Sequence, residues 1–309
     1  MRNIVSGGAG FLGSHLVEKL MNNGDSVICI DNLLTGNINN ISKWINNSRF
    51  TFINHDVVNY ISLDVDNIWH LACPASPFHY QEDPFRTSEI IFLGTYNMLK
   101  LAKECNAKFI LASSSEVYGE PLEHPQSENY SGSVNTTGYR SCYEEGKRLA
   151  ESITKDFANQ YRIDVKIARI FNTYGPRMQI SDGRVISNFI CQALKGHPLT
   201  IFGDGNNTRS FCYVDELIDG LYKLMFTEYN YPVNLGNPEE YSIIELAKII
   251  IGKIDQNLVI KNLPKLKDDP MRRKPDINLA NNLFGWSPSI DLNLGLDKTI
   301  TYFNSIIYK

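Results

Sequence analysis

A glycine-rich turn near the amino end constrains the fold of this chain more than any other feature. Gly7, Gly10 and Gly13 lie between a short apolar stretch, residues 3–6, and an amphipathic stretch, residues 11–21. In such a turn the first glycine permits a tight bend, the second lets the backbone approach a pyrophosphate, and the third lets helix and strand pack closely. Free N–H groups at the helix start attract a phosphate. The turn therefore predicts a strand–loop–helix unit that binds a dinucleotide.

An acidic residue follows the second apolar stretch. Residues 26–30 run directly into Asp31. A carboxylate at this position accepts hydrogen bonds from a ribose diol and repels a 2′-phosphate, which favours NAD over NADP. Asp56 follows a third apolar stretch, residues 50–53. This residue is a candidate partner for the adenine and, equally, a candidate N-cap of a helix.

Strand-like and helix-like stretches alternate through the first half of the chain. Further strands and helices are expected at residues 67–72, 84–104, 108–113, 141–161 and 165–170. Such alternation predicts right-handed βαβ units. We therefore expect the α/β class, with a Rossmann-type doubly wound parallel sheet and a smaller C-terminal mixed α/β lobe.

The periodic pattern loosens after residue 171, where the chain becomes rich in turns and polar residues. We expect a NAD-binding domain over residues 1–171, to which the chain returns around residues 211–236. Residues 172–309 are expected to form mainly the substrate-binding lobe. A ligand cleft between the two is the expected active site.

Composition disfavours several classes of function. The formal net charge of −4 gives no basic field for nucleic acid. The sequence has no run of about 18 apolar residues, so no membrane span is expected. The first strand begins too near the first residue for a signal peptide. The six cysteines are scattered without a CxxC pair, which favours free thiols in a reducing compartment over zinc ligands or disulfides. We expect a cytoplasmic protein that binds no nucleic acid, membrane or metal.

A tyrosine and a lysine four residues apart predict proton transfer. Tyr143 and Lys147 share one face of the helix expected at residues 141–161. A lysine ammonium, together with a cationic nicotinamide ring, lowers the pKa of a phenol so that it can take a proton from a sugar hydroxyl. Tyr96 and Lys100 have the same spacing, so the spacing alone does not identify the catalytic pair.

The preceding strand separates the two pairs. Ser114, Ser115 and Glu116 follow the strand that comes before Tyr143, and hydroxyl groups there can reach the same substrate oxygen. No such strand precedes Tyr96, which lies in the middle of its helix. We therefore expect Tyr143 to be the catalytic phenol and Tyr96 to have a packing role.

Together these motifs resemble those of the extended short-chain dehydrogenases/reductases, and among them the UDP-glucuronate decarboxylases (UDP-xylose synthases). The resemblance covers nearly the whole chain. Beyond the glycine turn and the Tyr143/Lys147 pair, it is carried by residues 70–77, 115–119, 169–176, 182–185, 208–211, 232–240 and 268–276.

The serine–glutamate pair after the fifth strand narrows the reaction that the resemblance implies. Related 4,6-dehydratases carry an acid where this chain has Ser115, and related 4-epimerases usually lack a glutamate at the place of Glu116. Ser-Glu with Arg273 downstream is typical of the decarboxylases. By resemblance, Ser115, Glu116 and Arg273 manage the substrate carboxylate and the C5 proton, without a division of roles, and Ser114 joins Tyr143 in stabilising an enolate oxygen.

The resemblance also implies positions for the cofactor NAD and for a UDP-sugar. Arg184 and Arg209 are the expected pyrophosphate contacts, because a guanidinium group pairs with two phosphate oxygens at once. Weaker candidates for substrate binding are Asn172, Asn188 and Tyr213. Besides the residues already named, Phe11, Leu12, Asn32, Thr35, Gly36, Val57, Leu71 and Ala72 are expected to contact the cofactor.

Two residues depart from the family pattern. Glu89 stands where relatives usually have lysine, which reverses a charge near an anionic substrate. Arg86, one turn earlier on the expected helix, can compensate for this change. Ile91 stands where relatives have an asparagine that helps to hold cofactor and substrate, and the sequence offers no compensation for it.

The two long helices at residues 84–104 and 141–161 pack, in relatives, against their copies from a second subunit. The resemblance therefore implies a homodimer built through a four-helix bundle. Three alternatives to the decarboxylase stay open. They are a nucleotide-sugar 4-epimerase, an enzyme that releases the 4-keto pentose, and a catalytically silent sensor that binds NAD and a nucleotide sugar.

Overall fold

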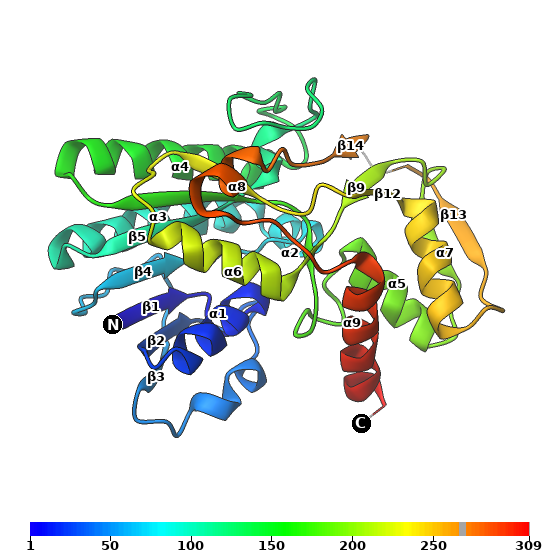
Figure 1. Cartoon of the computed structure of the whole chain (residues 1–309), viewed down its shortest axis with the longest axis horizontal. Coiled ribbons are helices and arrows are strands. Elements are labelled where there is room, and N and C mark those ends of the chain that lie inside the picture. Colours follow the sequence, from blue (N-terminus) through cyan, green and yellow to red (C-terminus); the bar gives the residue numbers. More distant parts are fainter. Residues whose placement is uncertain (266–269, 309) are drawn as a thin grey trace.

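A seven-stranded sheet occupies the larger part of the computed structural model, which describes residues 1–265 and 270–308 (Figure 1). Its strands are β1 (Arg2–Ser6), β2 (Ser26–Asp31), β3 (Phe50–Asn54), β4 (Asn67–His70), β5 (Lys108–Ser114), β6 (Val165–Ile170) and β11 (Pro232–Leu235). The order across the sheet is β11-β6-β5-β4-β1-β2-β3, and all neighbouring strands are parallel. The predicted Rossmann-type sheet is confirmed.

Helices cover both faces of this sheet. They are α1 (Phe11–Asn22) and α6 (Val214–Met225) on one face, and α3 (Pro84–Cys105) and α4 (Ser141–Tyr161) on the other. Because successive side chains of a strand point to opposite faces, neighbouring residues enter different cores. Val5 and Trp69 pack in the core under α1 and α6, whereas Ile4 and Ile68 pack in the core under α3 and α4.

The switch in strand order lies between β1 and β4, since the chain builds outward from β1 in both directions. In doubly wound sheets, ligands bind at the carboxyl ends of the strands next to such a switch. Strand β4 ends at His70, two residues earlier than expected, and the chain then runs as a loop to Ser76, the N-cap of α2 (Pro77–Glu82). That loop opens space above the switch point.

Smaller elements lie beyond the carboxyl ends of the large sheet, on the right of Figure 1. Three small sheets pair β10 (Cys212–Tyr213) with β7 (Thr173–Tyr174), β9 (Thr208–Ser210) with β12 (Glu240–Ser242) and β14 (Arg272–Arg273), and β8 (Leu199–Phe202) with β13 (Ile260–Leu263). The remaining α-helices are α5 (Val185–Leu194), α7 (Ile243–Ile254), α8 (Asn278–Phe284) and α9 (Leu292–Ile307). The short 3-10 helices are η1 (Ile38–Asn40), η2 (Ser42–Trp44) and η3 (Ser115–Tyr118).

Strand β14 brings a distant part of the chain to the site, because Arg273 pairs in register with Arg209 of β9. Of the sequence stretch 268–276, residues 268 and 269 lie outside the described part of the chain. In the two described ranges, no helix is both long enough and apolar enough to cross a membrane.

Candidate active site

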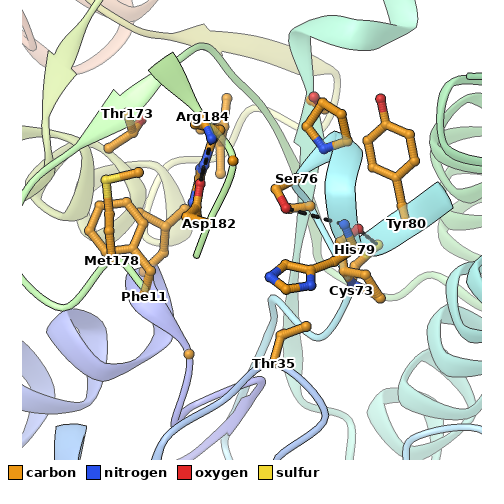
Figure 2. A pocket seen from close by; sticks show the side chains of 18 of the residues that line it. Phe11, Thr35, Cys73, Ser76, His79, Tyr80, Thr173, Met178, Asp182 and Arg184 are labelled. Carbon is orange, nitrogen blue, oxygen red and sulfur yellow. Dashed lines mark hydrogen bonds and ion pairs between the residues drawn. The ribbon is translucent and has the colours of Figure 1, made fainter. Parts of the chain in front are cut away.

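A cavity of about 400 Å³ opens at the carboxyl ends of the central strands and extends under the smaller sheets. Figure 2 shows part of its lining. Phe11, Met178 and a paired Asp182 and Arg184 lie on one side, and Tyr80 lies on the other. The cavity therefore has one wall from the glycine-turn side and another from the segment that follows β4.

The glycine turn forms one end of the cavity and has the geometry that its sequence predicts. Gly7 adopts a φ of +71°, a conformation that other residues rarely take. A side chain at Gly13 would place its Cβ 2.0 Å from the carbonyl oxygen of Gly7. Helix α1 begins after Gly10 without a side-chain cap, so its first N–H groups are available to a phosphate.

Asp31 closes the turn on its other side. One carboxylate oxygen accepts a hydrogen bond from the N–H of Ala9 at 3.0 Å, and the other accepts one from the N–H of Leu33 at 2.8 Å. Burial raises the pKa of Asp31, and these backbone donors act in the opposite direction. This buried acid beside a glycine-lined turn fits the ribose of NAD, because a 2′-phosphate would meet its charge.

Tyr143 lies at the first turn of α4, where the helix meets the carboxyl end of β5. Its side chain is 5% exposed, and its ring stacks on that of Tyr80 with centroids 4.8 Å apart. Burial raises the pKa of Tyr143, while hydrogen bonding with Ser114 lowers it. The phenol is therefore protonated in the protein alone, and its ionisation requires added positive charge nearby.

Lys147 lies one turn further along α4 and is equally buried. Its ammonium group donates a hydrogen bond to the carbonyl oxygen of Ala112 on β5 at 2.9 Å and lies 5.8 Å from the ring centre of Tyr143. This bond anchors a cation below the phenol. The structure thus brings Ser114, Tyr143 and Lys147 together, as the sequence predicts.

The second tyrosine–lysine pair lies outside the cavity. Tyr96 is 42% exposed, and its ring meets that of Phe157 edge-on at 5.7 Å. Lys100 lies over the ring of Tyr60 at 4.1 Å. The packing role expected for Tyr96 agrees with these contacts.

Glu116 lies among arginines in the cavity lining. One carboxylate oxygen pairs with Arg140 at 2.5 Å and with Arg273 at 3.4 Å. Burial alone would raise the pKa of Glu116, but the guanidinium groups of Arg140 and Arg273, with a smaller effect of Arg209, hold it below its ordinary value. Glu116 is therefore ionised, and it shares Arg140 with Glu144, whose carboxylate lies 3.3 Å from the same guanidinium group.

Arg273 is the most deeply buried of these arginines, with 1% of its surface exposed. It donates hydrogen bonds to the carbonyl oxygens of Ser115 and of Gly119, the latter at 2.9 Å. Desolvation lowers the pKa of Arg273, and the neighbouring Arg209 acts in the same direction. The geometry thus brings Ser115, Glu116 and Arg273 together, although they are far apart in sequence.

Arg184 lines the cavity near the start of α1. Its guanidinium group forms a two-pronged ion pair with Asp182 and lies 5.5 Å from the ring centre of Phe11. Burial works against its charge, but Asp182 raises the pKa of Arg184. Asn188, one turn into α5, donates to the carbonyl oxygen of Gly183 at 3.0 Å.

Most residues that the sequence predicts for the site line this cavity. They are Gly7, Gly10, Phe11, Leu12, Gly13, Asp31, Asn32, Thr35, Asp56, Val57, Leu71, Ala72, Ser114, Ser115, Glu116, Tyr143, Lys147, Asn172, Arg184, Asn188, Arg209 and Arg273. Two predicted residues do not line it. Gly36 lies behind the carboxylate of Asp31, where a Cβ would come within 2.7 Å of it, and Tyr213 packs edge-on against Tyr174.

Asp56 is held by its neighbours. Its carboxylate accepts hydrogen bonds from Asn32 at 2.9 Å and from the N–H of Val58 at 3.1 Å, and it also pairs with Arg86. The residue heads a turn and no helix begins there, so the helix-cap alternative is wrong. The same Arg86 pairs with Glu89, which is the compensation expected for the reversed charge.

Ile91 turns away from the cavity and into the contact between α3 and α4. It is buried, and a Cβ added at Gly146 of α4 would come within 2.8 Å of its Cδ1 atom. The isoleucine therefore fills a place where the two helices approach closely, and its neighbour Ile90 reaches the cavity instead.

Sequence reasoning did not single out Arg140 and Tyr80, both of which line the cavity. Arg140 lies three residues before Tyr143, so helical spacing places it on the same face, and this signal could have found it. Tyr80 lies in α2. Its role as the stacking partner of Tyr143 depends on a tertiary contact that no local pattern reports.

A glycine turn for a dinucleotide and a buried tyrosine–lysine pair facing one crevice are the arrangement of the extended short-chain dehydrogenases/reductases. These are NAD-dependent enzymes built on a Rossmann sheet. The chain belongs to the NAD dependent epimerase/dehydratase family, whose model matches residues 3–236.

Known proteins resemble this chain over nearly its whole length. UDP-glucuronic acid decarboxylase 4 of Arabidopsis thaliana is 53% identical over 308 residues, covering 100% of this chain and 70% of the relative. UDP-glucuronic acid decarboxylase 1 of Danio rerio is 50% identical, covering 98% and 72%. The structure of a UDP-glucuronic acid 4-epimerase from Bacillus cereus with UDP-glucuronic acid and NAD superimposes with a TM-score of 0.89 at 30% identity, covering 99% of this chain and 100% of that one.

Proposed function

We propose that this protein decarboxylates UDP-glucuronate to UDP-xylose, with NAD as a cofactor that is regenerated in each turnover. The observation that carries the proposal is the cluster of Arg140 and Arg273 around Glu116, next to Tyr143. A guanidinium group can pair with the carboxylate of a bound glucuronate, and a neutral hexose has no such group at C6. About 50% identity to proteins named UDP-glucuronic acid decarboxylases supports the same substrate.

The reaction follows from the position of the carboxylate. Oxidation at C4 makes a ketone, and the C6 carboxylate is then β to it. A β-keto acid loses CO2 readily because the electrons of the broken bond flow into an enolate. Protonation at C5 and reduction at C4 then give the pentose. NAD held between the glycine turn and Asp31 would supply the oxidation and the later reduction at C4.

Tyr143, Ser114 and Lys147 are the residues that we assign to the C4 oxygen. The phenolate of Tyr143 takes the hydroxyl proton during oxidation and gives it back during reduction. Ser114 donates a hydrogen bond to the same oxygen when it carries enolate charge. Lys147, anchored on Ala112, supplies positive charge that stabilises the phenolate.

Ser115, Glu116 and Arg273 are assigned to the carboxylate and to the C5 proton, with Arg140 added by the structure. The guanidinium groups hold the carboxylate before it leaves, and Glu116 keeps them oriented in its absence. At the nucleotide end, Arg184 and Arg209 are assigned to the pyrophosphate. Asn172 and Asn188, which also line the cavity, are assigned to the rest of the UDP.

Incubation with UDP-glucuronate and NAD in D2O, followed by NMR, tests the proposed function. We expect UDP-xylose that carries deuterium at C5, together with released CO2. Formation of the C4 epimer without CO2 would instead identify a 4-epimerase, and accumulation of the 4-keto pentose would identify an enzyme that releases the intermediate. Binding of NAD and UDP-glucuronate without any turnover would identify a sensor.

We further propose that the protein forms a homodimer through α3 and α4. These helices pack against each other, and apolar side chains on both remain exposed, among them Phe92 and Tyr96 on α3 and Leu149 on α4. A second copy of the same surface would cover them as a four-helix bundle.

Free thiols at all six cysteines support a reducing, cytoplasmic setting.

Light scattering after size-exclusion chromatography tests the dimer. Leu149→Glu places a charge on the proposed interface and is expected to give monomers. Val259→Glu, at an exposed apolar residue before β13, is the matched control and should leave the mass unchanged. A monomeric mass for the wild-type protein would contradict the homodimer.

A further inference from the structure

Three buried residues outside the cavity lining connect Arg273 to the rest of the active site. We infer that Tyr118, Asn234 and Gln126 are positioning residues, which fix the guanidinium group of Arg273 relative to Glu116 and thereby set the rate of CO2 loss. The inference rests on the proposed decarboxylation. Hydrogen bonds and short lengths of backbone join these residues and Arg273 into a closed ring through four separate parts of the chain, and each of the four residues is almost fully buried.

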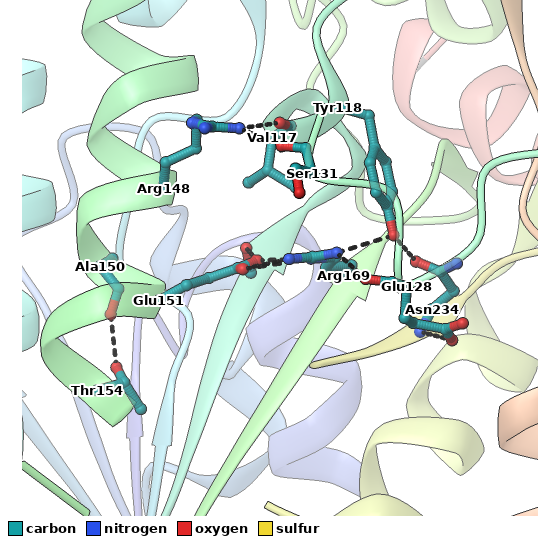
Figure 3. A network of polar contacts seen from close by, with 11 residues as sticks. Val117, Tyr118, Glu128, Ser131, Arg148, Ala150, Glu151, Thr154, Arg169 and Asn234 are labelled. Atoms are coloured by element: carbon teal, nitrogen blue, oxygen red, sulfur yellow. Dashed lines mark hydrogen bonds and ion pairs between the residues drawn. The ribbon is translucent and has the colours of Figure 1, made fainter. Parts of the chain in front are cut away.

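The ring begins at the 3-10 helix η3, which carries both Glu116 and Tyr118. The phenol of Tyr118 donates a hydrogen bond to the side-chain oxygen of Asn234 on β11 at 2.8 Å (Figure 3). Burial raises the pKa of Tyr118 to about 12, so this phenol remains a donor at neutral pH. The edge strand of the large sheet is thus tied to the helix that presents the catalytic glutamate.

The ring continues from Asn234 to Gln126. The side-chain amide of Asn234 donates to the carbonyl oxygens of Gln126 at 3.0 Å and of Asp276 at 3.1 Å. Gln126 then forms two hydrogen bonds with Lys274, the residue that follows Arg273. Its N–H donates to the carbonyl oxygen of Lys274, and its side-chain oxygen accepts from the N–H of Lys274, each at 2.9 Å.

Arg273 closes the ring by returning to η3. Its guanidinium group donates to the carbonyl oxygens of Ser115, the first residue of η3, and of Gly119, which follows the last. A shift of Gln126 or Asn234 would therefore move the backbone of Arg273 while η3 stays in place. Because transition-state contacts depend on placement to a fraction of an ångström, such a shift weakens decarboxylation selectively.

A second arm of the network reaches the helix that carries Tyr143. Arg169 of β6 donates to the phenol oxygen of Tyr118 at 3.0 Å and forms a two-pronged ion pair with Glu151 of α4 (Figure 3). Ser113, the neighbour of Ser114, donates to the same glutamate at 2.5 Å. The oxidation residues thus have their own support through Glu151, which does not pass through Asn234 or Gln126.

Because the two groups of residues have separate supports, loss of the ring should slow CO2 release more than oxidation. In the Tyr118→Phe variant the bond to Asn234 and the bond from Arg169 are both lost, while Arg169 keeps its ion pair with Glu151 and its hydrogen bond to the carbonyl oxygen of Glu128. We expect CO2 release to slow by about 10- to 100-fold, the size of effect that a small misplacement of a catalytic group produces. Oxidation at C4 should be nearly unchanged, so enzyme-bound reduced nicotinamide should build up during a single turnover.

The decisive experiment combines Tyr118→Phe with Arg273→Ala and follows both nicotinamide absorbance and CO2 in single turnovers of UDP-glucuronate. If Tyr118 acts through Arg273, its substitution should have no further effect on CO2 release once Arg273 is absent. Gln126→Met, which removes the side-chain hydrogen bonds with Lys274 and with the carbonyl oxygen of Glu123 at similar volume, should reproduce the build-up. It replaces Tyr118→Phe in the test if that variant does not fold.

Thr299→Val is the control for losing a buried hydrogen bond, because its hydroxyl donates to the carbonyl oxygen of Gly295 at 2.7 Å on α9. It should change neither step. Equal slowing of oxidation and CO2 release by Tyr118→Phe, or an additive effect with Arg273→Ala, would overturn the inference. No CO2 release by the wild-type enzyme would overturn the proposed function itself, and the two failures are therefore distinguishable.

Discussion

Tyr143 and Lys147 lie on α4, and Tyr96 and Lys100 lie on α3 with the same spacing. The first tyrosine is buried under a second ring at the carboxyl end of β5, and its lysine is anchored on a strand carbonyl. The second tyrosine is half-exposed, and its lysine lies over a surface tyrosine ring. In each pair, helical spacing puts the tyrosine and the lysine on the same face of their helix. Spacing therefore cannot explain why the two tyrosines have different surroundings.

The surroundings explain it. A phenol that is buried beside a fixed cation and a hydroxyl has a pKa that a bound cofactor and substrate can change, because each added charge acts through a medium of low polarity. A phenol that is open to water is screened, and the same charges change its pKa little. The surroundings of the tyrosine, and not its spacing from the lysine alone, therefore decide which pair can transfer protons.

Tyr143→Phe should have the largest effect. The substitution removes the only atom of this side chain that can take the C4 hydroxyl proton, and general acid–base catalysis of this kind contributes about 10²- to 10⁴-fold. We expect the rate of C4 oxidation to fall by that factor in stopped-flow measurements, while NAD binding measured by calorimetry is unchanged. Normal turnover of the variant would remove Tyr143 from the proton-transfer step.

Lys147→Met should have the next largest effect and should move the pH profile. Burial already raises the pKa of Tyr143, and loss of a nearby cation raises the pKa of a phenol further. The rate rises with pH as the phenol ionises, so its rising limb should shift to higher pH. A slower rate with an unshifted limb would mean that Lys147 only anchors α4 on Ala112.

Ile91→Asn tests the helix contact that lies between the two pairs. An amide placed against Gly146 has no partner there, and a buried polar group without a partner costs about 1–3 kcal/mol. We expect the free energy of unfolding in urea to fall by this amount, with no gain in substrate affinity. Ile91→Val, which keeps the apolar contact, is the control. Tighter binding of UDP-glucuronate by the asparagine variant would show that relatives' asparagine can be accommodated here.

The local sequence pattern was sufficient to predict those parts of the site that depend on the backbone or on a single helix or strand. The glycine turn, Asp31 and the Tyr143–Lys147 helix could be predicted because each depends on residues close in sequence. Helical spacing points to Arg140 but does not report its ion pair with Glu116, and no local pattern points to Tyr80, because both roles depend on which charges and rings the fold brings together.

Residues that the structure places away from the cavity lining show the same limit. Tyr213 stands close in sequence to Arg209, which lines the cavity, yet its ring packs against Tyr174 instead. Gly36 lies so close to the carboxylate of Asp31 that a Cβ there would come within 2.7 Å of it. Ile91 occupies the place of a polar residue because it packs against Gly146, a contact that joins two helices. In each case the side chain's direction is decided by packing between elements, which spacing along one element does not report.

Tyr96→Phe should have the smallest effect and completes the comparison, because it makes the same chemical change as Tyr143→Phe at the same spacing. The ring keeps its edge-on contact with Phe157, and only a hydroxyl outside the cavity lining is lost. We expect C4 oxidation, its pH profile and the dimer mass to be unchanged, and stability to change by less than about 0.5 kcal/mol. A loss of oxidation comparable to that of Tyr143→Phe would mean that exposure does not separate the two pairs.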